Sequence, residues 1–396
     1  MINDVVIIGS GPAGLSLAKA LVNLNLKVIV IDKLPQEKIE FPQYDGREIA
    51  LTIASQQIMS QLGQWQLIPD KNIHLIQSAR VLDGNSPYFL KFIPQNAHND
   101  RLGYIISNHN IRKAAFTAVQ DNNSIDFLFG REVTNINFNN DSATVYINDG
   151  STLSARLVVA ADSRFSKLRQ LSGISCNMLD FGRTCIVCRV AVTKPHDHIA
   201  TEWFQYNQTL ALLPLGPNEL SVVITIKTDQ RHKILSLSPD YFSAYLAQQV
   251  EDRFGNIQLV SELYSYPLVA TYASQFYTKR FALVGDAAIG MHPVTAQGFN
   301  LGLLSINALA EEVSKAIASN QDIGSTRILE VYHRHHHRTS YPIYTATNHL
   351  VRLYTDTHFY AKIVRKALLR LGNHVKPARR LIVNRLTQSI TATRLT

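Results

Sequence analysis

The segment VVIIGSGPAG at 5–14 constrains the fold more than any other feature of the chain, because its glycines separate an apolar run from a helix-like run. Residues 4–9 are typical of a buried strand, and residues 12–25 carry apolar side chains at helical spacing. KVIVID at 27–32 then predicts a second strand that ends in an acid. Strand, turn, helix and strand in this order form a βαβ unit, which requires a parallel sheet.

The glycines have the spacing of a phosphate-binding turn. Gly9 permits the tight turn, Gly11 lets the backbone approach a pyrophosphate, and Gly14 lets the helix pack closely on the strand. The helix that follows begins at Pro12 and Ala13, and its N-terminus favours negative charge. The turn therefore predicts a phosphate-containing ligand.

The acid at the end of the second strand extends this pattern. Asp32 lies where a carboxylate accepts hydrogen bonds from both hydroxyls of an adenosine ribose, and Lys33 follows it directly. The pattern as a whole predicts a dinucleotide and does not by itself choose between NAD and FAD. An ordinary strand-to-helix turn is the alternative.

Length and hydropathy indicate a globular protein. The chain has 396 residues, 46% of them apolar, and its longest apolar runs fall short of the roughly 18 residues that a membrane-spanning helix needs. The N-terminus runs from Asp4 straight into a strand rather than through a signal peptide. These features predict a cytoplasmic protein.

Two clusters of candidate metal ligands carry weaker signals. Cys185 and Cys188 lie in the strand-like run TCIVCRVAV, which turns the two thiols to opposite faces, and no second pair completes a zinc site. His333 and His337 are four residues apart in a helix-like segment with no cysteine nearby. We predict no metal site.

Two stretches of short alternating strands, around 74–93 and over 184–267, interrupt the first pattern. No long linker separates them from the rest, so the segments must interleave. The predicted fold is α/β (α+β), with a helical C-terminal tail. A Rossmann-type dinucleotide-binding domain takes residues 1–73, 100–180 and 268–350, a mostly antiparallel β-sheet domain takes 74–99 and 181–267, and a basic tail takes 351–396.

Three stretches in chain order resemble the fingerprints of class A flavin-dependent aromatic hydroxylases, which share the p-hydroxybenzoate hydroxylase fold. They are GSGPAG at 9–14, AADSRFSKLR at 160–169 and GDAAIGMHPVTAQGFNLGL at 285–303. Within that family, REIALT at 47–52, ALLPLG at 211–216 and MHPVTAQGFNLGL resemble the ubiquinone-biosynthesis hydroxylases, most closely the branch that acts on demethoxyubiquinol. The resemblance implies FAD as the cofactor, NADPH or NADH as co-substrate, and the β-sheet domain as the substrate domain.

The resemblance also implies which residues hold the flavin. Asp286 matches the acid that binds the ribityl chain or a neighbouring ribose, and His292 and Pro293 lie beside the isoalloxazine ring. Ser163 departs from the family, which has glycine there, and a positive φ at this position would be costly. The complete set of cofactor-binding candidates is Gly9, Gly11, Pro12, Ala13, Gly14, Asp32, Lys33, Arg47, Asn108, Asp162, Arg169, Gly285, Asp286, Pro293, Gln297, Gly298, Phe299 and Asn300.

The implied reaction is hydroxylation of an electron-rich ring, and it needs a chamber that excludes water. No catalytic acid or base is assigned, although His292, Pro293 and Arg47 are candidates beside the flavin. The predicted substrate is a lipophilic quinol or phenol, specifically demethoxyubiquinol. A soluble aromatic substrate and a non-catalytic flavoprotein scaffold are the alternatives. Chamber candidates, each of which taken alone is better explained as core, are Trp203, Phe204, Leu212, Leu213 and Pro214.

The tail from Arg352 onward holds ten Lys and Arg residues against one acid, so it accounts for the whole formal net charge of +9. Apolar residues between Phe359 and Leu371 recur at helical spacing, with Lys362, Arg365, Lys366 and Arg370 on another face. Such a helix suits peripheral contact with the inner (cytoplasmic) membrane or with a quinone-biosynthesis complex; packing on its own domain is the alternative. No nucleic-acid-binding motif accompanies the charge.

Overall fold

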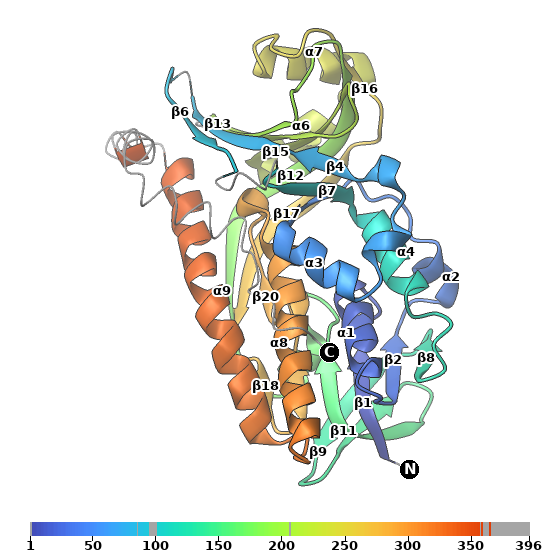
Figure 1. The fold of residues 1–396 in the computed structure, drawn as a ribbon. Helices are drawn as coiled ribbons and strands as arrows, with labels where there is room; N and C mark the ends of the chain where they lie inside the picture. The colour runs from blue at the N-terminus through green and yellow to red at the C-terminus, as the bar shows by residue number, and fades with distance from the viewer. Residues whose placement is uncertain are drawn as a thin grey trace.

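A parallel sheet built from the βαβ unit forms the lower part of the molecule in Figure 1. The computed structural model describes residues 2–84, 86–94, 101–205 and 207–356, with His358, Val364 and Arg365. The sheet has the order β18 (Tyr277–Thr278), β19 (Phe281–Leu283), β11 (Thr152–Ala160), β1 (Ile2–Ile8), β2 (Val28–Asp32) and β8 (Ile125–Phe129). From β19 to β8 the pairs are parallel, and the antiparallel strands β10 (Ala143–Ile147) and β9 (Val133–Phe138) extend β11.

Helices pack against this sheet and place two N-termini near its carboxyl edge. α1 (Pro12–Val22) contacts both α4 (Asn108–Thr117) and α8 (Gly298–Ala318), and α9 (Thr326–Thr355) runs alongside α8 (Figure 1). Their apolar faces share one continuous core with the parallel strands, which are buried on both sides as helix-covered strands are. Shorter helices are α2 (Gln36–Glu40), α3 (Ile53–Gln61) and α5 (Lys167–Leu171), with 3₁₀ turns η1 (Trp65–Leu67) and η2 (Asp70–Asn72).

A second, larger sheet lies at the top of Figure 1. Its order is β20 (Ile289–Gly290), β17 (Tyr264–Ala273), β12 (Cys176–Val192), β15 (Glu219–Lys227), β14 (Gln208–Pro214), β13 (Ile199–Gln205), β5 (Ser78–Asp83) and β6 (Phe89–Phe92), with β16 (Ile257–Leu259) beside β12. All pairs are antiparallel except β13 with β5. One face packs on η3 (Thr228–Gln230), α6 (Arg231–Leu235) and α7 (Pro239–Gln249), which leaves the other face for the rest of the molecule.

A small antiparallel sheet of β3 (Glu48–Thr52), β7 (Gly103–Ser107) and β4 (His74–Ile76) lies between the two larger ones (Figure 1). The long strands β12 and β17 run across positions 181 and 268, where the sequence analysis divided the domains. The two sheets are therefore joined by continuous strands, and the exact division into domains stays a prediction.

The predicted α/β architecture is confirmed, including the βαβ opening and the interleaved antiparallel layer. Cys185 and Cys188 lie in different apolar clusters on opposite faces of β12, as the strand pattern predicts. In the described ranges no three His, Cys, Asp or Glu side chains are grouped as metal ligands. Nor does any described helix have the length and apolar character needed to cross a bilayer.

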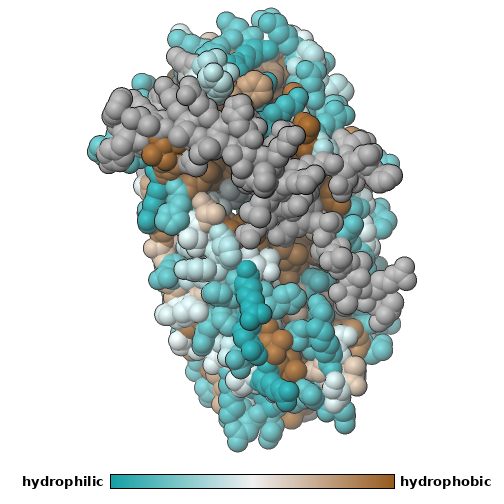
Figure 2. Space-filling view, turned by 60° about the vertical axis from the view of Figure 1, so that its left-hand side comes forward, coloured by the Kyte–Doolittle hydropathy of each residue, from teal (hydrophilic) through white to brown (hydrophobic). Residues whose placement is uncertain are grey.

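The described end of the chain bears on the prediction for the tail. Arg365 is buried rather than solvated, and its Nη1 donates to the carbonyl oxygens of Leu353, Tyr354 and Asp356 at 3.0, 3.2 and 2.8 Å. These carbonyls belong to the C-terminal end of α9, where a cation is favourable. The predicted amphipathic helix otherwise lies outside the described residues. On the face in Figure 2, apolar residues form small groups among a hydrophilic majority.

Candidate functional site

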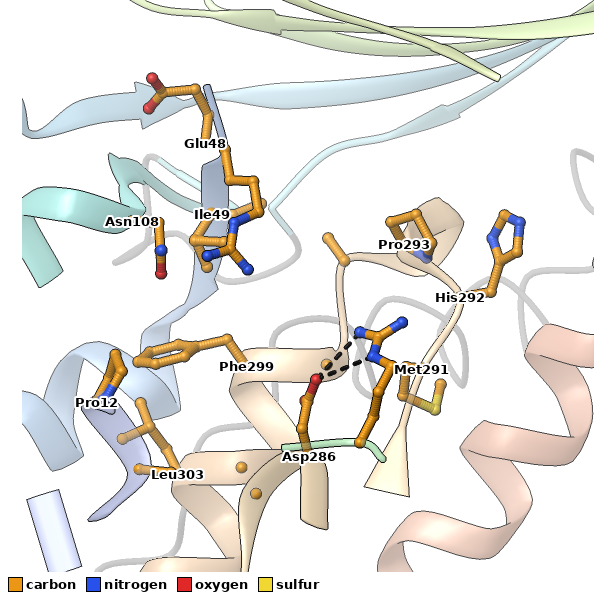
Figure 3. Close-up of a pocket in the computed structure, with 18 of the residues that line it drawn as sticks. Pro12, Glu48, Ile49, Asn108, Asp286, Met291, His292, Pro293, Phe299 and Leu303 are labelled. Carbon is orange, nitrogen blue, oxygen red and sulfur yellow. Dashed lines mark hydrogen bonds and ion pairs between the residues drawn. The ribbon is translucent and has the colours of Figure 1, made fainter. Parts of the chain in front are cut away.

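A cleft of about 550 Å³ opens between the loops of the parallel sheet and the uncovered face of the larger sheet (Figure 3). Its lower wall is formed by the first turns of α1 and α8, and the strand β3 lines one side. Of the predicted site residues, those that line the cleft are Gly11, Pro12, Ala13, Arg47, Asn108, Asp162, Gly285, Asp286, His292, Pro293, Gly298 and Phe299. Three segments far apart in the sequence thus meet at one place.

The glycine turn at the end of β1 has the geometry that its sequence predicts. Gly9 has φ +110°, and a Cβ on Gly14 would overlap the carbonyl oxygen of Gly9, so close packing of helix on strand requires both glycines. A Cβ on Gly11 would have no atom within 4 Å, because this position faces the open cleft. No side chain caps the N-terminus of α1, which leaves its N–H groups directed at whatever the cleft holds.

Asp32 closes the same turn from the end of β2. Its Oδ2 accepts hydrogen bonds from Ser10 N and Ser10 Oγ, both at 2.7 Å, and its Oδ1 accepts from Leu34 N at 2.8 Å. The carboxylate therefore holds the turn in place, with lone pairs left for a further donor. Lys33 is exposed, and neither residue lines the cleft itself.

An ion pair crosses the floor of the cleft between the second and third fingerprints. Arg164 donates from Nε and Nη2 to Asp286 Oδ2 at 3.3 and 3.1 Å, as the dashed lines in Figure 3 mark, and from Nη1 to Val269 O at 2.9 Å. Arg169 is buried away from the cleft, where its Nη1 donates to Ala287 O at 2.8 Å. Arg169 thus fixes the loop that carries Asp286.

Asp45 positions two of the predicted site residues on the opposite side of the cleft. Its Oδ2 accepts from Arg47 Nη2 at 2.6 Å and from Asn108 Nδ2 at 2.8 Å, which joins two predicted site residues to one carboxylate. Burial opposes ionisation of this carboxyl, but the hydrogen bonds from Arg47 and Asn108 prevail and lower the pKa of Asp45. The sequence analysis missed Asp45, although the acid-glycine-arginine run at 45–47 is a local turn signal.

His292 is neutral at physiological pH. Burial first, and then Arg183 and Arg164, lowers the pKa of His292 to about 4. Its Nδ1 accepts from Val294 N at 3.2 Å, so the ring proton lies on Nε2, which is buried and has no partner within the described part of the chain. The ring packs edge-on against Phe181, with centroids 4.7 Å apart. Within the cleft this residue is a hydrogen-bond donor rather than a cation.

The N-terminus of α8 is the second uncapped helix start at the cleft. Ala296 adopts a left-handed conformation with φ +52° and turns the chain from η5 (Pro293–Thr295) into the helix, and Gln297 provides no side-chain cap. The Asn300 amide donates to Ala50 O and Ala296 O and accepts from Thr52 N, so it fastens the first turn of α8 to β3. The Asn300 side chain therefore positions this helix start from outside the cleft.

The middle fingerprint carries the departure noted from the sequence. Ser163 lines the cleft and is not among the residues with positive φ, so its Cβ introduces no backbone strain. Burial raises the pKa of the adjacent Asp162, whose Oδ1 has no hydrogen-bond partner among the described residues. A buried carboxyl oxygen in this position marks a place for a donor from a ligand.

The upper wall of the cleft is the uncovered face of the larger sheet. Of the predicted chamber residues, Leu213 lines this wall. Trp203 and Leu212 pack on the opposite face of the sheet with α6 and α7. The Phe204 ring packs against Tyr354 of α9, with ring centroids 3.9 Å apart. Pro214 is buried but does not line the cleft. The wall is formed by Glu202, Thr209, Ala211, Leu213, Val223 and Thr225, of which only Leu213 was among the candidates.

A family model described as an FAD binding domain matches residues 3–345. The chain belongs to this family of flavin-dependent monooxygenases. It is 44% identical over 389 residues to the ubiquinone hydroxylase UbiM of Neisseria meningitidis, which covers 97% of this chain and 84% of the relative. It is 32% identical to the ubiquinone hydroxylase UbiL of Rhodospirillum rubrum, over 96% of this chain and 88% of the relative. Membership of the ubiquinone-biosynthesis hydroxylases, predicted from the sequence, is thereby confirmed.

Solved structures agree with the fold. The p-nitrophenol 4-monooxygenase PnpA of Pseudomonas putida superposes with a TM-score of 0.75 at 16% identity and covers 98% of both chains. PqsL of P. aeruginosa, in complex with 2-aminobenzoylacetate, has a TM-score of 0.77 at 18% identity over 92% of this chain and 100% of that one. A 24% identical relative over 83% of this chain is the 3-demethoxyubiquinol 3-hydroxylase of Escherichia coli.

The residues of the cleft fit the FAD of the family. Two uncapped helix starts, the open position at Gly11 and the unpartnered Asp162 Oδ1 supply donors and acceptors for phosphates and hydroxyls. When bound, FAD reduced by NAD(P)H supplies, with dioxygen, an electrophilic oxygen atom. The chain's own residues bind and orient the partners and exclude water. The roles of single residues toward FAD stay a prediction.

Proposed function

We propose that this protein hydroxylates a ring carbon of a polyprenylated quinol in ubiquinone biosynthesis, with demethoxyubiquinol as the substrate. The observation that carries the proposal is the cleft itself, which joins the flavin-binding loops to a wall of Ala211, Leu213 and Val223. An apolar wall accommodates a substituted ring and excludes water from the reacting atoms. The demethoxyubiquinol hydroxylase named above supports the choice of substrate.

The side chains around the cleft have separate roles in the proposed reaction. Asp45 holds Arg47 and Asn108, and Asp286 holds Arg164, so four charged groups and one amide are fixed before any ligand binds. Preorganised donors of this kind stabilise negative charge without reorganisation. The α8 N-terminus adds a positive potential at the same floor. The apolar sheet face orients the ring above them.

The test is oxygen incorporation by the purified, FAD-loaded protein. The protein is incubated with NAD(P)H, ¹⁸O₂ and a short-chain demethoxyubiquinol analogue, and the product is examined by mass spectrometry. One labelled oxygen atom in the ring product is expected. Oxidation of NAD(P)H that yields hydrogen peroxide alone would rule out this substrate and favour a soluble aromatic one. A flavin that NAD(P)H never reduces would favour a non-catalytic scaffold.

We also propose that the basic tail brings the protein to an anionic membrane surface, where a polyprenylated quinol dissolves. The charge of residues 357–396 supports this, since they hold nine Lys and Arg residues and no acid. Arg365 does not contribute, because it is committed to the end of α9.

A further inference from the structure

Glu202 is an acid on a wall that is otherwise apolar or hydroxyl-bearing. It lies in the middle of β13, opposite Ala211 of β14 and Val81 of β5. Its neighbours Thr201 and Trp203 are buried on the other face of the sheet, so strand alternation turns Glu202 into the cleft. Among the described lining residues of this wall, it alone carries an ionisable side chain.

The Glu202 carboxyl has no hydrogen-bond or ion-pair partner among the described residues. An unpaired carboxyl in an apolar setting costs free energy, since no group replaces the water it has lost. Desolvation by burial accordingly raises the pKa of Glu202 to about 8. The residue is half-buried, and its accessible atoms face the cleft. A carboxyl that stays in the cleft despite this desolvation cost is well placed to bind a polar group of a ligand.

The other charged and titratable groups of the cleft lie on its floor and side, and most are already engaged. Arg47 is held by Asp45, and Arg164 is paired with Asp286. The side chain of Glu48 is fully buried and pairs with Arg189 at 2.6 Å. His292 is neutral, as described above, and Arg112 and Asp162 complete the set. None of them bonds to Glu202, so the carboxyl stays available to a ligand beneath the sheet.

We propose that the Glu202 carboxyl binds a ring hydroxyl of the phenol or quinol substrate and accepts its proton as the ring is hydroxylated. The inference rests on the proposed function. The substrate O–H bond breaks, its electron pair stays on the ring oxygen, and the proton forms an O–H bond on Glu202. The ring then takes up the electrophilic oxygen atom that the flavin chemistry supplies. The hydroxylated carbon then loses its hydrogen as a proton, which would neutralise the base left when the flavin chemistry delivers the oxygen atom. Glu202 returns its own proton to the ring oxygen, and the ring regains aromaticity.

A base is most effective when its pKa lies near the working pH, which a desolvated glutamate achieves and an exposed one does not. Below its pKa the neutral carboxyl can only donate to the ring oxygen, whereas the ionised form accepts the proton. The rate of the chemical step should therefore rise about tenfold per pH unit below this pKa and level off above it. A substrate hydroxyl that ionised without help would show its own pH dependence in every variant.

The test uses the FAD-loaded full chain with Glu202→Gln, the shorter carboxylate Glu202→Asp, and Glu251→Gln as a matched control. Glu251 is an exposed glutamate that pairs with Arg253 and does not line the cleft. Turnover of the demethoxyubiquinol analogue is measured from about pH 6 to about pH 9. Binding of a 2-prenylphenol and of its methyl ether is measured in parallel from the change in flavin absorbance, without turnover.

We expect Glu202→Gln to lower kcat about 100-fold and to abolish its rise with pH, with partial recovery in Glu202→Asp and no change in Glu251→Gln. With Glu202 ionised, the wild type should bind the phenol about tenfold more tightly than its ether, and Glu202→Gln, whose amide oxygen is a neutral and weaker acceptor, should keep only part of that preference. A Glu202→Gln enzyme with wild-type kcat and pH profile would overturn the inference, as would a wild type without the phenol preference. If the wild type shows the preference but does not hydroxylate the quinol, the proposed substrate fails and the role of Glu202 stands.

Discussion

Asp286 carries a carboxylate that the fold has already paired, and this pairing decides what its replacement should do. Arg164 holds Asp286 Oδ2 through two donors on the floor of the cleft. In Asp286→Asn the geometry is nearly kept, but the charge that fixes Arg164, and that we predict accepts hydrogen bonds from ligand hydroxyls, is lost. We expect the dissociation constant of FAD to rise about tenfold or more, since a hydrogen bond to a charged group contributes about 1.5–3 kcal/mol.

Titration of the apoprotein with FAD, followed by flavin fluorescence, measures this change. Glu132→Gln is the matched control, because Glu132 pairs with Lys167 in an exposed ion pair outside the cleft. FAD affinity in Asp286→Asn equal to that of the control would show that Asp286 does not contact the cofactor.

Buried histidines should make the protein sensitive to mild acid. Burial lowers the pKa of His336 to about 3, with smaller contributions from His335, His333 and His337. An unfolded histidine titrates at about 6.5, so between that pH and about pH 3 the unfolded chain binds a proton that the native chain does not. Stability should fall as pH drops through this window, by a few kcal/mol for this one group.

His336→Gln tests the direction of this pH dependence of stability, because glutamine stays neutral at every pH. The thermal midpoint of the wild type should fall between pH 7 and about pH 5 more steeply than that of His336→Gln. Replacement of exposed His335 by glutamine is the control and should keep the wild-type slope. Parallel curves for the wild type and His336→Gln would mean that His336 is protonated in the native state.

At the scale of elements, the turn between β1 and α1 separates two functions of glycine. A Cβ on Gly14 would overlap Gly9 O, whereas one on Gly11 would meet nothing within 4 Å. Gly14→Ala should therefore lower the thermal midpoint of the apoprotein by several degrees, because strand and helix must separate. Gly11→Ala should leave that midpoint unchanged and weaken FAD binding instead. Thermal unfolding with and without FAD distinguishes the two, and a Gly11→Ala protein that binds FAD as the wild type does would show that the phosphates lie elsewhere.

The first turn of α8 depends on a single amide. Asn300 donates to Ala50 O and Ala296 O and accepts from Thr52 N and Ser55 Oγ, which ties the helix to β3. Asn300→Ala leaves these buried groups without partners, at a cost of about 2–4 kcal/mol in the free energy of unfolding. Urea unfolding measures it, with Asn123→Ala, in the exposed turn before β8, as the control. A change equal to that of the control would mean that α8 is positioned by packing alone.

For the whole molecule, the position of its charge predicts where it binds. Replacing Lys376, Arg379, Arg380 and Arg385 with glutamine removes four positive charges outside the described residues and keeps Arg365 at the end of α9. We expect binding to anionic vesicles to weaken by about 1 kcal/mol per residue, while the thermal midpoint stays the same. Co-sedimentation with vesicles of phosphatidylglycerol, and with phosphatidylcholine as the control, measures it. Equal sedimentation of variant and wild type would favour packing of the tail on its own domain.

Local features of the sequence determined the fold class and the cofactor. Gly9, Gly11 and Gly14 require a particular backbone whatever surrounds them, and strand and helix periodicities follow from the geometry of the chain itself. The family, and with it FAD, was therefore identified from the resemblance of three short stretches.

Only the tertiary structure decided which side chains face the cleft. Alternation along β13 and β14 predicts two faces, but the sequence does not say which face α6 and α7 cover. Trp203 and Leu212 face these helices, and Glu202 and Leu213 face the cleft. The sequence also did not reveal which charged residues pair across long distances along the chain, since Arg164 and Asp286 are 122 residues apart. Periodicity and turn chemistry act over a few residues, whereas the choice of face and of charge partner depends on how whole sheets and helices pack together.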